Sequence, residues 1–418
     1  MRIIVAGIGV GVACCLVFAS LAALDAEQIR QTPPQTSPPA AKKLIRRVWL
    51  THKSNTPDKI VINWETQLVG DSVVRYGRTA KYGKTVRIDE KVTLHHVKIP
   101  LPDKGGVYHY SVASGDRRSS DATFKGYPTD TLRVAIAANW QRRADLSAIL
   151  KDDVHLLISA GDNISSIRQF AKPGAKDATR AYSKLIDSYP KLFASVPFMP
   201  ALGNHDREIR PRGKKYPPQA VYDIEAAAFR AFFELPDDEW KWRFDIPDFG
   251  VRFIALDLNH VSDFGTTWQS SHSYKTSAPQ YKWYRKLIDE SKNAFVVTIY
   301  NERNATVRSL EKGSWGRLLK LKSGSITVSG FGYFCERAEA AGRSFYNISL
   351  NGKGDKYPDP KSKFLASENC YLLLTFQRGA KEMTAELKQL ETGKVLHWTT
   401  HRVGAADQAA APPALEQK

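Results

Sequence analysis

"PALGNHD", residues 200–206, ends an apolar run with a glycine and three polar side chains, and this stretch decides the fold. "SAGDN", residues 159–163, has the same form earlier in the chain. In α/β proteins, functional groups gather where strands end in loops. Five strand ends carry polar or aromatic residues at this point: Asn139, Asp162, Asn204, Asn301 and Phe331.

Around these motifs, residues 131–402 alternate strand-like and helix-like segments. Buried strands are predicted at 133–138, 155–161 and 198–203, and amphipathic helices at 144–153, 177–196, 222–236 and 278–291. This order predicts an α/β (α+β) domain with one large mixed sheet, or with two sheets packed face to face and flanked by helices.

Residues 45–128 have a different pattern. Seven short runs, such as "KIVINWET" and "VYHYSVAS", alternate apolar and polar residues and are separated by turn residues. The pattern predicts a small N-terminal β-sandwich of the fibronectin III type.

The two ends of the chain are not globular in composition. Residues 1–26 combine one positive charge with a long apolar stretch, which indicates an export signal, an uncleaved membrane anchor or, through Cys14, a lipoprotein. Residues 27–44 form a Pro-rich linker and residues 403–418 a disordered tail. Each alternative places the body outside the cytoplasm, in the periplasm, in the cell envelope or secreted.

The net charge of +18 favours anionic partners. Because the body is expected outside the cytoplasm, an acidic or phosphorylated glycan is a better candidate than nucleic acid. Contact with a membrane is expected only through the possible N-terminal anchor.

Two cysteines remain in the body, Cys335 and Cys370. Neither has metal-ligand spacing, so the alternatives are buried free thiols or a disulfide.

The five strand-end motifs, in this order, resemble the calcineurin-like metallophosphoesterases. The preceding sandwich resembles the N-terminal domain of purple acid phosphatases, and together the resemblance covers nearly all of residues 45–402. It implies a hydrolase with two metal ions that clamp a phosphate ester and activate water. Matched to that pattern, Asp162 is the bridging carboxylate, Asn204 a carbonyl ligand and His205 the catalytic histidine that contacts the phosphate.

The other family ligands are replaced. Asn139 stands for an aspartate, Gln141 for a frequent histidine, and Asn301 (or Tyr300, after a shift of one residue) for a histidine. Phe331 and Tyr333 occupy the final two histidine positions. Two divalent ions a few ångströms apart repel by roughly 20 kcal/mol even at an effective dielectric constant of about 20, so one carboxylate and several neutral amides cannot hold them. The expected cofactor is therefore none, or one weakly bound divalent ion on oxygen ligands.

A loop rich in cations follows the histidine motif. Arg207, Arg210 and Arg212 are expected to bind an anion without metal, because guanidinium groups make paired hydrogen bonds to oxyanions. His260 ends another strand beside the same site. Phe331 and Tyr333 are interpreted either as hydrophobic plugs or as an aromatic platform for a sugar ring.

Two hypotheses follow. The protein is a pseudo-phosphatase that has lost its dinuclear centre and binds an anion or glycan, or it is an active phosphomonoester hydrolase with an atypical or mononuclear metal site.

Overall fold

The computed structural model describes residues 45–140, 144–168, 170, 172, 174–211, 221–259, 272–273, 275–302, 314–319, 324–340, 342–354, 356 and 360–404. The predicted signal or anchor, the linker and nearly all of the predicted tail lie outside these ranges, as do Gln141, Arg212 and His260. Among the described helices, none is both long and apolar enough to cross a membrane.

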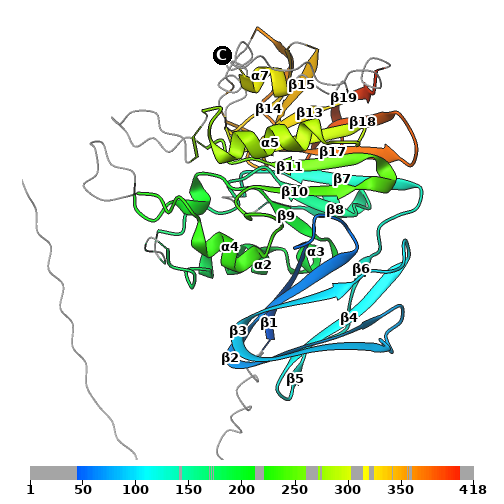
Figure 1. Ribbon diagram of the computed structural model, residues 1–418, viewed down its shortest axis with the longest axis vertical. Coiled ribbons are helices and arrows are strands. Elements are labelled where there is room, and N and C mark those ends of the chain that lie inside the picture. Colours follow the sequence, from blue (N-terminus) through cyan, green and yellow to red (C-terminus); the bar gives the residue numbers. More distant parts are fainter. Residues whose placement is uncertain are drawn as a thin grey trace, which may run out of the picture. The chain divides into compact units, whose positions relative to one another are not determined.

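The N-terminal region forms a six-stranded antiparallel sheet, at the lower end of Figure 1. Its strands are β1 (Ile45–Thr51), β2 (Lys59–Gly77), β3 (Lys84–Pro100), β4 (Val107–Ser114), β5 (Arg117–Arg118) and β6 (Ala122–Lys125).

Several of the predicted short strands are merged into longer ones. The runs at 59–66 and 72–79 are the two halves of β2, which pairs with β1 along its first half and with β4 along its second. The pairing register with β3 shifts on both sides of Gly70, so β2 continues through an irregularity where two separate strands were expected. The region has an apolar core of its own, which includes Trp64 and Tyr110. Its assignment as a fibronectin III domain ending at residue 128 remains a prediction.

The rest of the chain builds two further sheets. The first has seven strands in the order β10 (Trp242–Ile246), β11 (Val251–Ala255), β12 (Phe295–Tyr300), β13 (Ile326–Ser329), β15 (Arg343–Asn347), β14 (Cys335–Ala340), β16 (Ser362–Ala366). The second has six in the order β19 (Val395–Arg402), β18 (Glu382–Gln389), β17 (Cys370–Gln377), β7 (Thr131–Ala137), β8 (Leu156–Ser159), β9 (Phe198–Pro200). We call them the seven-stranded and six-stranded sheets.

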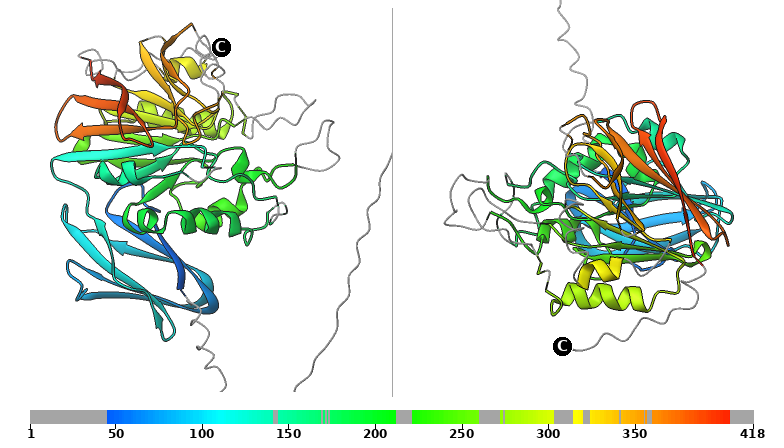
Figure 2. Two further views of the ribbon diagram at one scale, coloured as in Figure 1. Left: turned by 180° about the vertical axis from the view of Figure 1, so that it is seen from behind. Right: turned by 90° about the horizontal axis from the view of Figure 1, so that it is seen from above.

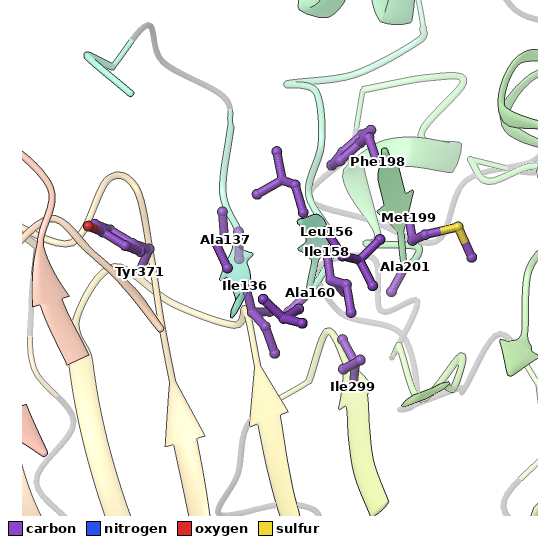
Figure 3. Close-up of a cluster of buried hydrophobic side chains, with 14 of the residues drawn as sticks. Ile136, Ala137, Leu156, Ile158, Ala160, Phe198, Met199, Ala201, Ile299 and Tyr371 are labelled. Atoms are coloured by element: carbon purple, nitrogen blue, oxygen red, sulfur yellow. The ribbon is translucent and has the colours of Figure 1, made fainter. Parts of the chain in front are cut away.

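These two sheets share one hydrophobic core. Ile136 and Ile158 of the six-stranded sheet and Ile299 of the seven-stranded sheet are fully buried in it (Figure 3). Strands β7–β9 are mutually parallel, and so are β11, β12, β13 and β15. The mixed α/β arrangement agrees with the prediction of two sheets packed face to face.

Helices α5 (Pro279–Asp289) and α7 (Ser314–Leu319) share a second apolar cluster with β11 and β12, on one face of the seven-stranded sheet (Figure 2). The other helices are α1 (Ser147–Lys151), α2 (Arg180–Ser188), α3 (Pro190–Ser195) and α4 (Ala227–Phe233), with 3₁₀ turns η1 (His205–Arg207) and η2 (Pro247–Phe249). The single helix predicted over 177–196 is divided at Tyr189, which has φ −139° and ψ 52°. The ring of Pro190 disfavours helical geometry in the residue before it.

Strand β1 belongs to two cores. Trp49 stacks on Phe232 of α4 at a ring distance of 4.2 Å, whereas Leu50 packs into the core of the N-terminal sheet. Arg47 donates hydrogen bonds of 2.9 and 2.7 Å to Asp187 at the end of α2. The predicted boundary near residues 128–131 is therefore crossed by packing and by ionic contacts.

Both body cysteines are free thiols. Cys335 and Cys370 are buried. Interaction with the Cys370 thiol, followed by burial, raises the pKa of Cys335 well above its ordinary value.

Candidate functional site at the strand ends

Five of the predicted site residues lie at one edge of the two packed sheets. Asn139, Asp162 and Asn204 follow β7, β8 and β9, while Asn301 and Phe331 follow β12 and β13. Hydrogen bonds between the loops of the two sheets, described next, bring the ends of facing strands together. We call this place the strand-end edge.

Asn139 joins the ends of β7 and β13. Its side-chain Nδ2 donates to the carbonyl oxygens of Gly330 at 2.7 Å and Gly332 at 2.8 Å, and it lies 3.0 Å from Ser349 Oγ. The residue is 1% exposed and has φ 60°, in the left-handed region. An aspartate could not make these bonds, because a carboxylate has no proton to donate to a carbonyl.

Two more asparagines join facing strands in the same way. Asn301, after β12, donates to Ala160 O at 3.0 Å after β8. Asn259, after β11, donates to Leu202 O at 3.0 Å after β9. We call Asn139, Asn259 and Asn301 the asparagine clasp. All three amides donate to backbone carbonyl oxygens of the opposite sheet.

Asp162 holds the histidine motif in place. Its Oδ1 accepts a hydrogen bond of 3.2 Å from the backbone N–H of His205, at the start of η1. A Cβ atom built on Gly203 would lie 2.1 Å from the same Oδ1 and 2.1 Å from the Asp162 nitrogen, so this contact requires glycine. The backbone of Asp162 is left-handed, with φ 53°. The carboxylate therefore has a structural role in this turn.

A second carboxylate of the motif, Asp206, was not predicted as a site residue. It is fully buried and accepts hydrogen bonds from Gly203 N at 2.7 Å and from Asn163 Nδ2 at 3.0 Å. Burial, together with the nearby charge of Asp162, raises the pKa of Asp206 to about 8. Its position inside the turn, and not at the surface, explains why spacing alone did not identify it.

His205 is the most accessible of the retained motif residues. Its side chain is 22% exposed, and Nδ1 lies 2.7 Å from Ser165 O and 3.5 Å from Glu208 Oε2. When Nδ1 donates to the Ser165 carbonyl, a neutral ring carries its lone pair on Nε2.

The prediction that Arg207 belongs to an exposed, anion-binding loop is wrong. Its side chain is fully buried, with Nη2 donating to Asp257 Oδ2 at 2.9 Å and Nη1 donating to Ile224 O at 3.1 Å. A buried arginine needs such a partner, and this one lies far along the sequence on the loop after β11. Arg210 is half-buried.

His272 joins the buried pair of Arg207 and Asp257, and the sequence did not predict it. Its Nδ1 lies 2.6 Å from Asp257 Oδ2, and its ring stacks on Trp240 at 3.6 Å. Although burial alone would raise the pKa of Asp257, the neighbouring Arg207 and His272 hold it below its ordinary value. No sequence motif connects these residues, so only the fold could identify them.

Phe331 and Tyr333 lie outside the fully buried core. Phe331 is half-buried, and Tyr333 is 38% exposed. The backbone fixes their position, since Phe331 N donates to Ser329 Oγ at 3.2 Å and Gly354 N donates to Tyr333 O at 2.9 Å. The interpretation as an aromatic platform remains open.

The side chains present do not fit a dinuclear metal centre. Across the described ranges there is no group of three or more His, Cys, Asp and Glu side chains that could hold a metal ion. Asn139 directs its amide protons, which cannot bind a cation, into the strand-end edge, and positions 331 and 333 supply no imidazole. We therefore derive no catalytic step through a metal pair.

Comparison with known proteins agrees with this fold. Residues 132–315 match the family model for calcineurin-like phosphoesterases. No curated protein matches the chain in sequence.

Two solved structures resemble the chain over most of its length. One is a purple acid phosphatase from yellow lupin seeds, at 14% identity and a TM-score of 0.65, covering 87% of this chain and 75% of that one. The other is PhoD, at 12% identity and a TM-score of 0.62, covering 87% of this chain and 90% of that one. At these identities the likeness establishes the metallophosphoesterase type of fold, which confirms the resemblance seen in the sequence motifs.

Proposed function

We propose that this protein is an exported pseudo-phosphatase, which keeps the metallophosphoesterase fold without a dinuclear metal centre and binds an anionic ligand at the strand-end edge. Its expected partner is an acidic or phosphorylated glycan. The export part of the proposal rests on the composition of residues 1–26, which is typical of a signal or anchor segment.

The asparagine clasp carries this proposal. In a dinuclear enzyme the bridging charge between the two sheets would come from cations and carboxylates. Here three neutral amides join the same pairs of facing strands through hydrogen bonds of 2.7–3.0 Å. The fold can therefore close this edge without metal.

Support for an anionic ligand comes from charge and exposure. The chain has a net charge of +18, and His205 and Tyr333 both reach solvent near the strand ends. Arg210 and Arg212, together with His260, remain proposed contributors, whereas Arg207 is withdrawn because it is buried. A charged sugar presents both a ring, on which an exposed tyrosine can stack, and an oxyanion, which an arginine can bind.

One observation favours the alternative of an active hydrolase with a mononuclear site. Asp162, Asn204 and His205 stand together at the ends of β8 and β9, as the family's phosphate site requires. A single weakly held divalent ion on Asp162 and amide oxygens would satisfy the preferences of Mg²⁺ or Ca²⁺.

The two functions are separated by metal content and turnover. We expect protein purified without chelators to contain far less than two metal ions per chain by elemental analysis. We also expect negligible hydrolysis of p-nitrophenyl phosphate with added Mg²⁺, Mn²⁺ or Zn²⁺. Turnover that requires one equivalent of metal and is abolished by His205→Ala would establish the alternative and refute the pseudo-phosphatase.

Ligand binding is tested with polygalacturonate as an acidic glycan and dextran as a neutral one. We expect binding of polygalacturonate alone, weakening as salt rises because exposed charges are screened. Tyr333→Ala should weaken it. Trp398→Ala is the matched control, since Trp398 is an exposed aromatic residue on β19, at the far side of the six-stranded sheet from β9. Equal loss in both variants, or binding that ignores salt, would contradict the proposed site.

A further inference from the structure

A pocket lies where strands β7 and β8 of the six-stranded sheet begin, opposite the strand-end edge. It has a volume of about 320 Å³ and is bordered by the glycine turn before β4, the end of β6 and the residues that begin β7 and precede β8. Thr131 is the first residue of β7, and His155 directly precedes β8, so the pocket lies at the strand beginnings and not at the strand ends. Its volume is in the lower range of pockets that hold small molecules.

His155 supplies a hydrogen-bond donor to this pocket. The side chain is 9% exposed, and its Nδ1 accepts a hydrogen bond of 3.3 Å from the backbone N–H of Arg133. The neutral ring must then carry its proton on Nε2. Burial, with the nearby charge of Lys125 as a second cause, lowers the pKa of His155 to about 4, so the ring is neutral at pH 7. His155 lines the pocket, so Nε2–H is the donor that its ring can offer to a ligand.

The pocket also presents acceptors. Thr129 Oγ1 donates its proton to Asp130 Oδ2 at 3.3 Å, and Thr131 Oγ1 donates to Gln377 Oε1 at 2.8 Å. Because both hydroxyl protons are committed, the two oxygens face a ligand as acceptors, together with the exposed Asp130 carboxylate.

The charges around the pocket balance. Lys125 forms an ion pair with Asp153, and Arg133 Nη1 lies 4.0 Å from the same carboxylate. The two cations, Lys125 and Arg133, are therefore balanced by the two carboxylates of Asp153 and Asp130. A phosphate or carboxylate ligand would meet the Asp130 carboxylate and two hydroxyl lone pairs, and an ammonium ligand would meet Lys125. Neither ion is matched by this lining.

We infer that this pocket binds a small uncharged polyol, such as a neutral monosaccharide, through the His155 donor and the acceptors Thr129, Asp130 and Thr131. Each sugar hydroxyl both donates and accepts, so neighbouring hydroxyls can match alternating acceptors and donors. The turn at Gly105 borders open space in the pocket, because a Cβ added there would meet no atom within 4 Å. The inference is independent of the function proposed for the strand-end edge.

The test uses the full chain and glucose, galactose, mannose and N-acetylglucosamine as probes, with glucuronate and glucosamine as charged counterparts. Isothermal titration calorimetry and thermal melts should show millimolar binding of at least one neutral sugar, unchanged between low and high salt. The charged counterpart of the sugar that binds should bind at least about tenfold more weakly, a difference of about 1.4 kcal/mol.

Two variants locate the binding. Asp130→Asn removes an exposed acceptor charge, and His155→Phe keeps the ring but removes the Nε2–H donor; each should weaken binding by about tenfold. His401→Phe is the control, because His401 is also 9% exposed and its pKa is likewise lowered to about 4, but it bonds Tyr346 outside the pocket.

Several outcomes would overturn the inference. It fails if no neutral sugar binds, if glucuronate binds more tightly than glucose, or if Asp130→Asn leaves binding unchanged. Should His155→Phe fold poorly, Asp130→Asn alone decides, because that side chain is exposed.

Discussion

The two sheets meet at the strand-end edge, but they have kept different parts of the family pattern. The six-stranded sheet carries Asp162, Asn204 and His205, which fit the expected pattern, whereas the seven-stranded sheet carries Asn301, Phe331 and Tyr333 where the resemblance predicts histidines. The difference follows from packing. Gly203 lies so close to Asp162 that a Cβ added at Gly203 would force the backbone to move. Phe331 and Tyr333 reach partly into solvent, where a side chain can change at little cost.

This contrast teaches that a retained motif is weak support for retained chemistry. "GNHD" is needed here to form a turn, since Asp162 accepts the His205 N–H and Asp206 accepts the Gly203 N–H. The same residues would be required with or without metal. Phe331 and Tyr333, whose side chains reach solvent on the seven-stranded side, report more directly on function.

Gly203→Ala should have the largest effect on stability. The new Cβ would lie 2.1 Å from the nitrogen and Oδ1 of Asp162, and backbone cannot move aside cheaply. We expect a loss of roughly 4 kcal/mol or more in the free energy of unfolding, or no folded protein. Urea denaturation followed by fluorescence measures it. A melting temperature within a degree or two of the parent would show that the turn is not constrained as described.

Asn139→Asp should cost less, at roughly 2–4 kcal/mol. The new carboxylate would stand where the Asn139 amide donates to two carbonyl oxygens, at 2.7 and 2.8 Å, and it has no proton to donate to them. Asn301→Asp is the matched control, with a smaller loss because only one carbonyl, Ala160 O, faces that amide. Thermal melts with and without Mg²⁺ or Mn²⁺ provide the measurement. If metal made Asn139→Asp more stable than the parent protein, the site would be a metal site and the clasp would not replace one.

Acid should destabilise the protein through His52, a buried histidine outside the two sites discussed above. His52 is fully buried; burial lowers its pKa to about 4, below the ordinary value of 6.5. The unfolded state therefore takes up a proton first, so stability is complete above pH 6.5 and falls as the pH drops towards 4. The contribution of this residue is roughly 3 kcal/mol. Urea midpoints at several pH values should show the loss, and His52→Gln should reduce its slope, with the remainder coming from other buried histidines such as His155 and His401. An unchanged slope in that variant would assign the acid sensitivity to other groups.

Tyr333→Ala should have the smallest effect on stability, below about 1 kcal/mol, because the side chain is 38% exposed. Tyr346→Ala serves as the comparison, since the Tyr346 ring is fully buried and its loss should cost roughly 3–5 kcal/mol. A large loss for Tyr333→Ala in a denaturant titration would mean that the two sheets are equally constrained at this edge.

The order of strands and helices along the chain and the strand-end residues could be predicted because local pattern determines them. An apolar run that ends in a polar residue places Asp162 and Asn301 at strand ends. Arg207 shows where this reasoning stops. Its sequence neighbours are charged, so the loop reads as solvated, but the partner that buries it is Asp257 on another strand end. His272 has no local signal at all, since its contacts are to Asp257 and Trp240. Pro190 indicates the division at Tyr189, whereas the amphipathic period alone predicts one continuous helix.

The stacking of Trp49 on Phe232 has a consequence for how the chain folds. The first strand of the structure completes a core whose other members are synthesised much later. Contacts between residues so distant in sequence raise the contact order, and folding rates fall as contact order rises. The N-terminal sheet can collapse early around Trp64, but β1 has to keep one aromatic face exposed until α4 forms. During that interval Trp49 is a surface at which partly folded chains can associate.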